Sequence, residues 1–320
     1  MQHIATSAMG PNSLNGTESS GMHQTSKSKN TRWPTSDRVM TSPSNLLFSL
    51  ADHVVVITGA AGLLGRQHAD AVAAFGGHPV LLDLNSEAVT ALAAELRSTY
   101  DVDAQAFTVD ITDETALATT CAEVLQHYGK IDALVNNAAN NPKVEEGALG
   151  LATRLENFPL ESWNADISVG LTGAFLCAKH FGTAIFQTSK HGSIVNISSD
   201  LGLIAPDQRL YVKSGLRDDE QAVKPVTYSV VKTGIIGLTR YLSTYWTHNG
   251  QVVVRCNAIC AGGIENGQDT AFLASLNQRI PLGRLASSDD YQGVLIFLLS
   301  AASGYANGSV ISVDGGRTAW

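Results

Sequence analysis

The sequence predicts an α/β fold with one doubly wound parallel sheet of about seven strands and helices on both faces. Two observations support this fold class. From about residue 53 onward, short apolar runs that suit strands buried on both faces alternate with longer segments of helical period. Several of these runs end directly in polar or acidic residues. In a parallel sheet those positions share the edge at which ligands bind.

The composition narrows the function classes. The 320 residues, 44% of them hydrophobic, are enough for a large core, and the net charge of −8 argues against non-specific nucleic-acid binding. The chain has no uninterrupted apolar run of about 18 residues, so we expect no membrane span. Its four cysteines lack zinc-type pairing. We expect them to be buried thiols in a reducing cytosol, which predicts a cytoplasmic protein.

Residues 1–45 differ from the rest of the chain. They are rich in Ser, Thr, Asn and Gly and show neither helical nor strand periodicity. Such a segment buries too little apolar surface to offset its ordering entropy, so we expect a disordered tail. Two alternatives stay open for it, a transit peptide and a translation start at Met40.

The first strand, helix and strand predict a dinucleotide site. The apolar run at 54–57 leads into Thr58-Gly59-Ala60-Ala61-Gly62-Leu63-Leu64-Gly65 and then into a helix that extends to about Phe75. Glycines in this position permit a tight turn, and the helix N-terminus offers free N–H groups to a pyrophosphate. The strand at 79–82 ends at Asp83, 24 residues after Gly59. An acid there suits the adenosine ribose hydroxyls, and the alternative is that Asp83 only caps the next helix.

The alternation continues to the C-terminus. We expect helices at 86–99, 113–128, 160–186, 271–278 and 288–300, and strands at 104–109, 133–135, 193–197, 252–257 and 310–313. Residues 200–225 interrupt the pattern with an irregular segment that carries many charged residues, among them Asp207 and Lys224. A loop of this length inside a domain is usually functional or mobile, although a plain solvated insertion is the other interpretation.

The helix that follows this segment carries Tyr228 and Lys232. Their i, i+4 spacing places both side chains on one helical face. An ammonium group beside a phenol favours the phenolate and lowers the pKa of the tyrosine, which lets it exchange a proton with an alcohol. Because this spacing also occurs by chance, the pair gains meaning only from partners elsewhere in the chain.

Those partners are present and in order, and with them the chain resembles the short-chain dehydrogenase/reductase family in its compact branch. The resemblance covers about residues 48–320. It rests on Thr58-Gly59…Gly65, Asp110, Asn136-Asn137-Ala138, Asn196-Ile197-Ser198-Ser199, Tyr228-x-x-x-Lys232 and Val313-Asp314-Gly315-Gly316. It implies a single Rossmann-type domain over residues 46–320, with the 200–225 segment as an insertion, and NAD or NADP as cofactor.

The resemblance also implies roles for individual residues. Ser199 would hydrogen-bond the substrate oxygen, Tyr228 would be the acid/base, and Lys232 would lower the pKa of Tyr228 and hold the nicotinamide ribose. The cofactor-binding set implied in this way comprises Tyr228 and Lys232 together with Gly59, Gly62, Leu63, Leu64, Gly65, Asp83, Asp110, Ile111, Asn136, Ala138, Gly262 and Ile264. No metal is implied. Asp83, together with the absence of a basic residue at Gly62, favours NAD over NADP.

The chain departs from the family pattern at several positions. Leu63 stands where the compact branch has its middle glycine, and the resulting glycine spacing is similar to that of the extended branch, which includes epimerases and dehydratases. Gly170 occupies the position of the family's proton-relay asparagine, and Ala261-Gly262 replaces the usual Pro-Gly. Ser199 lies 29 residues before Tyr228, about twice the family spacing, because of the insertion.

Three segments, at 169–175, 205–211 and 315–320, further resemble a family subset associated with flagellin modification and nonulosonic-sugar pathways. We therefore expect an NAD(P)-dependent oxidoreductase that interconverts a secondary alcohol and a ketone on a polar, sugar-like substrate. Two rivals remain, a cofactor-recycling sugar epimerase or dehydratase and a non-catalytic dinucleotide-binding protein. The resemblance also implies a homodimer or homotetramer, and we expect no nucleic-acid or membrane partner.

Overall fold

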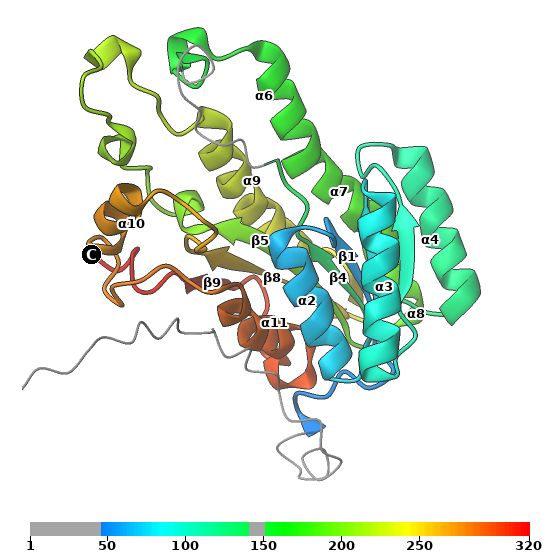
Figure 1. Ribbon diagram of the computed structural model, residues 1–320. Coiled ribbons are helices and arrows are strands. Elements are labelled where there is room, and N and C mark those ends of the chain that lie inside the picture. The colour runs from blue at the N-terminus through cyan, green and yellow to red at the C-terminus, as the bar shows by residue number, and fades with distance from the viewer. Residues whose placement is uncertain (1–45, 141–150) are drawn as a thin grey trace, which may run out of the picture. The chain divides into compact units, whose positions relative to one another are not determined.

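A computed structural model describes residues 46–140 and 151–320 (Figure 1). The predicted tail, residues 1–45, lies outside the described residues. The central sheet has seven strands in the order β3-β2-β1-β4-β5-β8-β9, and every pair in it is parallel. The chain thus winds outward from β1 first in one direction and then in the other. The predicted doubly wound parallel sheet is confirmed.

The strands lie close to their predicted positions. They are β1 (Val54–Thr58), β2 (His78–Asp83), β3 (Gln105–Thr108), β4 (Ala133–Asn136), β5 (Gly192–Ser199), β8 (Val254–Ala261) and β9 (Val310–Val313). In β1, alternate side chains enter opposite cores: Val55 and Ile57 belong to one apolar cluster, Val54 and Val56 to the other. This double burial explains why the strand is a continuous apolar run in the sequence.

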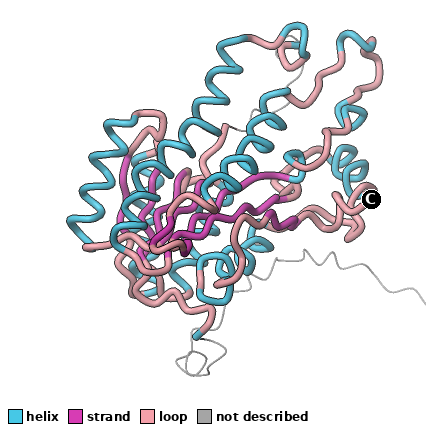
Figure 2. Tube along the Cα trace, turned by 180° about the vertical axis from the view of Figure 1, so that it is seen from behind, coloured by secondary structure: helices cyan, strands magenta, loops and turns pink. Residues whose placement is uncertain are grey.

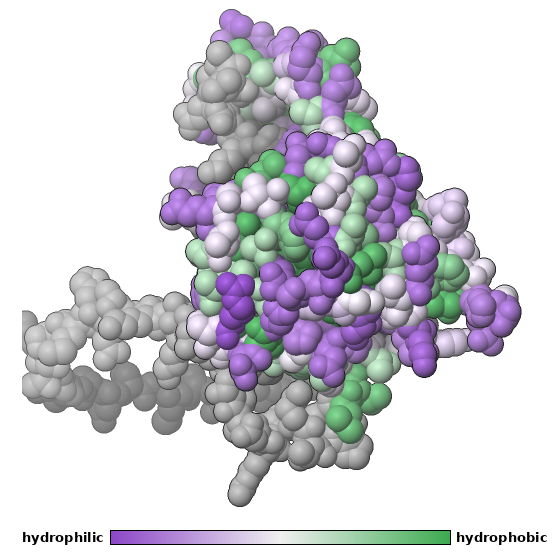
Figure 3. Space-filling view, turned by 90° about the vertical axis from the view of Figure 1, so that its right-hand side faces the viewer, coloured by the Kyte–Doolittle hydropathy of each residue, from purple (hydrophilic) through white to green (hydrophobic). Residues whose placement is uncertain are grey.

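Helices cover both faces of the sheet, which forms a central layer in the view from behind (Figure 2). The first face is covered by α2 (Leu63–Ala74), α3 (Ser86–Tyr100) and α11 (Gln292–Leu299), whose apolar side chains pack in one cluster with Leu50. The second is covered by α4 (Glu114–Tyr128), a long helix at residues 160–188 and α9 (Val226–Leu242). Hydrophilic side chains cover much of the side built by α3 and α4 (Figure 3), as expected of helix faces turned to solvent.

The long helix is built of α6 (Leu160–Ile167), α7 (Ala174–Cys177) and α8 (Thr183–Thr188), joined by the π-helical segments η2 (Ser168–Gly173) and η3 (Ala178–Gly182). Among the described residues it is the one helix long and apolar enough to cross a membrane by length and composition. More than half of its most apolar window, 56%, is buried inside the protein. Packing on the sheet and on α9 therefore accounts for its apolar character.

Several local predictions can be checked directly. The Asp113 side chain caps α4 by accepting from the N–H groups of Thr115 and Ala116, as expected. All four cysteines are buried and free, also as expected. The predicted strand at 252–257 is wrong at its start. Residue Val252 belongs to a small hairpin of β6 (Thr247–His248) and β7 (Gln251–Val252) that the apolar pattern did not reveal, and β8 begins at Val254.

The insertion is irregular, as predicted, but it is tied to its surroundings. It contains three short 3₁₀ turns, η4 (Asp200–Gly202), η5 (Gln208–Tyr211) and η6 (Asp218–Glu220). Leu210 packs in a small cluster with residues of α10 (Thr270–Asn277) and the loop that follows it, and Asp207 forms an ion pair with Arg279 at 2.8 Å. The insertion therefore shares a small core with the segment around α10.

Candidate active site

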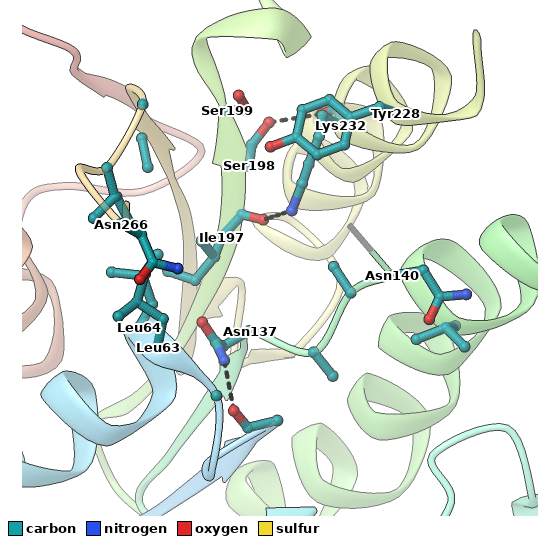
Figure 4. A pocket seen from close by; sticks show the side chains of 18 of the residues that line it. Leu63, Leu64, Asn137, Asn140, Ile197, Ser198, Ser199, Tyr228, Lys232 and Asn266 are labelled. Carbon is teal, nitrogen blue, oxygen red and sulfur yellow. Dashed lines mark hydrogen bonds between the residues drawn. The ribbon is translucent and has the colours of Figure 1, made fainter. Parts of the chain in front are cut away.

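A cavity of about 720 Å³ opens beyond the carboxyl ends of the strands (Figure 4). Its wall comes from the glycine turn after β1, the ends of β2, β4, β5 and β8, the N-terminal part of α9, the insertion and the C-terminal segment. Most of the predicted site residues line it: Gly59, Gly62, Leu63, Leu64, Asp83, Asp110, Ile111, Ala138, Ser199, Tyr228, Lys232, Gly262 and Ile264. The topology thus gathers positions up to 205 residues apart, from Gly59 to Ile264, around one space.

The turn between β1 and α2 depends on its glycines. Gly59 has a φ of +61°, and a Cβ there would lie 2.9 Å from the Cα of Ala138. Gly65 does not line the cavity. A Cβ at Gly65 would lie 2.1 Å from the carbonyl oxygen of Gly59, so this glycine lets α2 pack tightly on the turn. The N-cap residue Gly62 provides no side-chain cap, which leaves the first N–H groups of α2 for an anion in the cavity.

The acidic end of the cavity is formed by Asp83 and Asp110. Asp83 is not the cap of α3, because Asn85 holds that position, and the capping alternative is therefore wrong. One Asp83 carboxylate oxygen accepts from the N–H of Ala61 at 2.9 Å, which fixes the acid beside the glycine turn. Asp110 accepts from the N–H and the hydroxyl of Thr112. Both carboxylates lie where the adenosine half of a dinucleotide would bind, so the residues fit such a cofactor.

Asn136 does not line the cavity. Its side-chain amide is buried and donates to Asn196 Oδ1 at 2.9 Å and to the carbonyl of Ala174. It therefore ties β4 to β5 and to the long helix from beneath the site. The neighbouring residue Asn137 lines the cavity and donates to the carbonyls of Thr58 and Gly59.

One end of the cavity brings together Ser199, Tyr228 and Lys232, the three residues expected to be catalytic. The Tyr228 phenol lies beside the Ser199 hydroxyl, and a hydrogen bond donated by this hydroxyl would favour the phenolate. The Lys232 ammonium is buried and donates to the carbonyl of Ile197 at 3.0 Å (Figure 4). The hydroxyl of Ser198 donates to the backbone carbonyl of Lys232 at 2.7 Å, so the first serine of the pair holds α9 on β5 rather than entering the chemistry.

The expected lowering of the Tyr228 pKa by Lys232 is not found in this structure. Burial raises the pKa of Tyr228, the bond to Ser199 counteracts this in part, and the charge of Asp200 raises it further. Burial also lowers the pKa of Lys232 to about 8, so this lysine loses its proton more easily. The Lys232 Nζ lies 5.9 Å from the centroid of the Tyr228 ring. Spacing alone placed the pair on one face but could not reveal that both groups are desolvated.

Gly170, where the family's relay asparagine would be, is buried in η2. A Cβ at this position would lie 2.5 Å from Val231 Cγ1, so the close approach of the long helix to α9 leaves no room for a side chain. At the opposite wall, the C-terminal segment packs against the loop after β8. A Cβ at Gly262 would lie 2.8 Å from the Cα of Asp314, so this close packing depends on the glycine.

The sequence interpretation missed several cavity residues. Asp200 directly follows Ser199, accepts from the Ser199 hydroxyl at 2.7 Å and pairs with Arg317 at 2.6 Å. Tyr211 and Lys224 enter the cavity from the insertion. In the sequence, Lys224 is one charged residue of an irregular loop and Arg317 is one near the C-terminus. No periodic pattern connects either position to the predicted site.

Comparisons with known proteins agree with this geometry. A family model described as enoyl-(acyl carrier protein) reductase matches residues 59–318. The D-threitol dehydrogenase of Mycolicibacterium smegmatis is 29% identical over 276 residues, covering 85% of this chain and 95% of the relative. The NAD-dependent glycerol dehydrogenase of Listeria innocua is 28% identical over 284 residues, covering 85% and 96%.

Among solved structures, a gluconate 5-dehydrogenase from Burkholderia cenocepacia, in complex with NADP and tartrate, is similar with a TM-score of 0.73. It is 27% identical, and the match covers 87% of this chain and 99% of that one.

Proposed function

The chain belongs to the short-chain dehydrogenase/reductase family, and we propose that it oxidises a secondary alcohol of a polyhydroxylated, sugar-like substrate. The members similar to it are NAD(P)-dependent oxidoreductases acting on CH–OH groups. The single observation that carries the proposal is the joint presence of Ser199, Tyr228 and Lys232 at the end of a cavity whose other end fits a dinucleotide. The polyol substrates named for the relatives support the substrate class.

In this proposal Ser199, Tyr228 and Lys232 have different roles in the reaction. Bound NAD(P) would supply the acceptor or donor of a hydride. Tyr228 as phenolate accepts the hydroxyl proton of the alcohol, or as phenol returns it to the carbonyl oxygen. Ser199 holds that same oxygen, and the buried Lys232 ammonium would hold the nicotinamide ribose. Ser199 and Lys232 are buried and Tyr228 is partly buried, which limits the access of water to the reacting oxygen.

For the cofactor we propose a preference for NAD. The Asp83 carboxylate lies beside the glycine turn and would repel a 2′-phosphate. Replacing it in Asp83→Ser removes the repulsion, so the ratio of kcat/KM with NAD to that with NADP should fall by at least about tenfold. An unchanged ratio would show that Asp83 does not select the cofactor.

The substrate proposal is tested by assaying the purified protein with NAD and NADP against tetritols, pentitols, hexitols, butanediols and nucleotide sugars. Turnover of polyols with net NADH formation supports it. Tightly retained NAD with no net NADH formation would instead favour the epimerase or dehydratase alternative, to which the glycine spacing points. Turnover confined to nucleotide sugars would favour the flagellin-modification subset.

We also propose a cytoplasmic homodimer or homotetramer that associates through the long helices. The aromatic side chains of Phe175 on the long helix and Tyr241 near the end of α9 are 50% and 62% exposed, and exposed apolar side chains can mark an interface. Analytical ultracentrifugation tests this: Phe175→Asp should lower the sedimenting mass, whereas Leu84→Asp, at an exposed position near the cavity rim, should not. A monomeric wild-type protein would overturn the proposal.

A further inference from the structure

The insertion contributes an aromatic ring to the cavity, and α10 contributes a second ring beside it. Tyr211 of η5 and Phe272 of α10 both line the cavity, and their ring centroids lie 5.8 Å apart with the ring planes tilted by 39°. Both rings pack on the small apolar cluster of the insertion, of which Leu276 and Leu285 also line the cavity. These four side chains form one apolar section of the cavity, here called the aromatic wall.

The aromatic wall adjoins the end of the cavity that contains Tyr228. Burial raises the pKa of the Tyr211 phenol to about 12, so its hydroxyl keeps its proton at neutral pH. The charges of Arg317, Asp200 and Tyr228 also act on this pKa, so the hydroxyl lies close to these groups. Within residues 46–140 and 151–320 the Tyr211 hydroxyl has no hydrogen-bond partner, and it is therefore available to a hydroxyl group of a ligand.

The chain segments that carry the two rings are held in place. Phe272 lies in the first turn of α10, where the cap residue Asp269 accepts from its N–H at 3.1 Å. In the insertion, Leu210 is buried in the apolar cluster, and Asp207 pairs with Arg279 at 2.8 Å. A surface that is ordered in advance needs little further ordering when a ligand binds.

An apolar aromatic surface beside hydrogen-bonding groups suits a ring that carries hydroxyls. In a pyranose or a cyclitol the C–H groups gather on the ring faces, while most hydroxyls project from the edge. The face of an aromatic ring carries the negative part of its quadrupole and therefore attracts C–H groups. An open-chain polyol has no lasting apolar face, and it loses the freedom of several bonds when it binds.

We infer that the substrate is a polyol in ring form, a pyranose or a cyclitol, whose apolar face stacks on Tyr211 and Phe272 while one ring hydroxyl reaches Tyr228. The inference rests on the proposed function and narrows its substrate class from polyols in general to cyclic ones. Tyr211 and Phe272 are specificity-determining residues in this account, and Tyr228 remains the proposed acid/base.

The test compares neutral cyclic and open-chain compounds with NAD as cofactor. The cyclic compounds are myo-inositol, scyllo-inositol and the methyl pyranosides of glucose, galactose and mannose, and the open-chain compounds are D-glucitol, galactitol and D-mannitol. The best cyclic compound should exceed the best alditol in kcat/KM, and turnover of inositols or of pyranosides shows which ring class the protein uses. Tyr211→Leu and Phe272→Leu keep apolar packing but remove an aromatic face, so each should reduce this ratio by roughly 10-fold. Tyr211→Phe should retain most of it.

The matched control is Val212→Ala. Val212 follows Tyr211 in the insertion, is 61% exposed and does not line the cavity, so this change should leave the ratio as in the wild-type protein. Melting temperatures of all variants show whether the fold is kept.

A binding measurement separates the failure of this inference from the failure of the proposed function. With NADH in place of NAD an alcohol binds without reacting, and calorimetry should show tighter binding of the best cyclic compound than of the alditols. This difference should shrink in Tyr211→Leu. Alditols turned over at least as efficiently as cyclic compounds, or a ratio that both leucine variants leave unchanged, would overturn the inference and leave the dehydrogenase intact. Tighter binding of cyclic compounds without turnover of any compound would support the aromatic wall and count against the proposed function.

Discussion

Replacing Arg317 by Met should destabilise the protein and change the pH dependence of the reaction. The Arg317 and Asp200 side chains are 10% and 3% exposed and lie 2.6 Å apart. Removing one partner of a buried ion pair typically costs about 3–5 kcal/mol, because the other charge stays buried and unpaired. Asp200 keeps two donors, the Ser199 hydroxyl and the N–H of Leu201. We therefore expect the lower end, about 3 kcal/mol of unfolding free energy.

The same change acts on Tyr228, the proposed acid/base. The Asp200 charge already raises the pKa of Tyr228, and without Arg317 to offset it this effect grows. Alcohol oxidation requires the phenolate, so the pH at which kcat/KM reaches half its maximum should move upward in Arg317→Met.

Denaturant unfolding of the cofactor-free protein and a pH series of initial rates measure the two effects. Adding Asp200→Asn to Arg317→Met removes the unpaired charge and should restore much of the lost stability. A stability loss below about 1 kcal/mol, or a double variant no more stable than Arg317→Met, would refute the account of a buried pair.

Two further predictions concern stability. Burial lowers the pKa of His68 to about 4, below its unfolded value of about 6.5, so the fold favours the neutral ring. The unfolding free energy should therefore fall between pH 6.5 and 4 by up to about 3 kcal/mol, and denaturant titrations of His68→Leu should lack this share of the loss. An equal acid loss in both proteins would contradict this. Gly170→Ala forces a Cβ to 2.5 Å from Val231 Cγ1 and should cost about 1–3 kcal/mol, whereas Gly293→Ala, with nothing within 4 Å, should be neutral or stabilising. Equal melting temperatures for the two variants would show that the helices adjust freely.

Much of the fold can be predicted from local patterns of apolar residues and glycines in the sequence. Strands buried on both faces appear as apolar runs because each is covered by helices on both sides, as in β1. The glycine turn is recognisable because Gly59 and Gly65 occupy positions where a Cβ would collide with backbone. The β6–β7 hairpin was missed because its two-residue strands are exposed and carry no alternation.

The site was predicted less completely, for a physical reason. Ser199, Tyr228 and Lys232 lie in short motifs, whereas Lys224 and Arg317 reach the cavity through tertiary packing of an insertion and a C-terminal segment. Burial, which raises the pKa of Tyr228, depends on that packing and has no local signature in the sequence.

The central claim is that Tyr228 transfers the proton in an NAD(P)-linked oxidation. It is tested most directly by comparing NADH formation by the wild-type protein and Tyr228→Phe on the best substrate, with NAD binding to both measured by calorimetry. We predict unchanged NAD affinity and a kcat at least about 100-fold lower in the variant. A variant that binds NAD normally and keeps its kcat within a few-fold of the wild-type value would contradict the account.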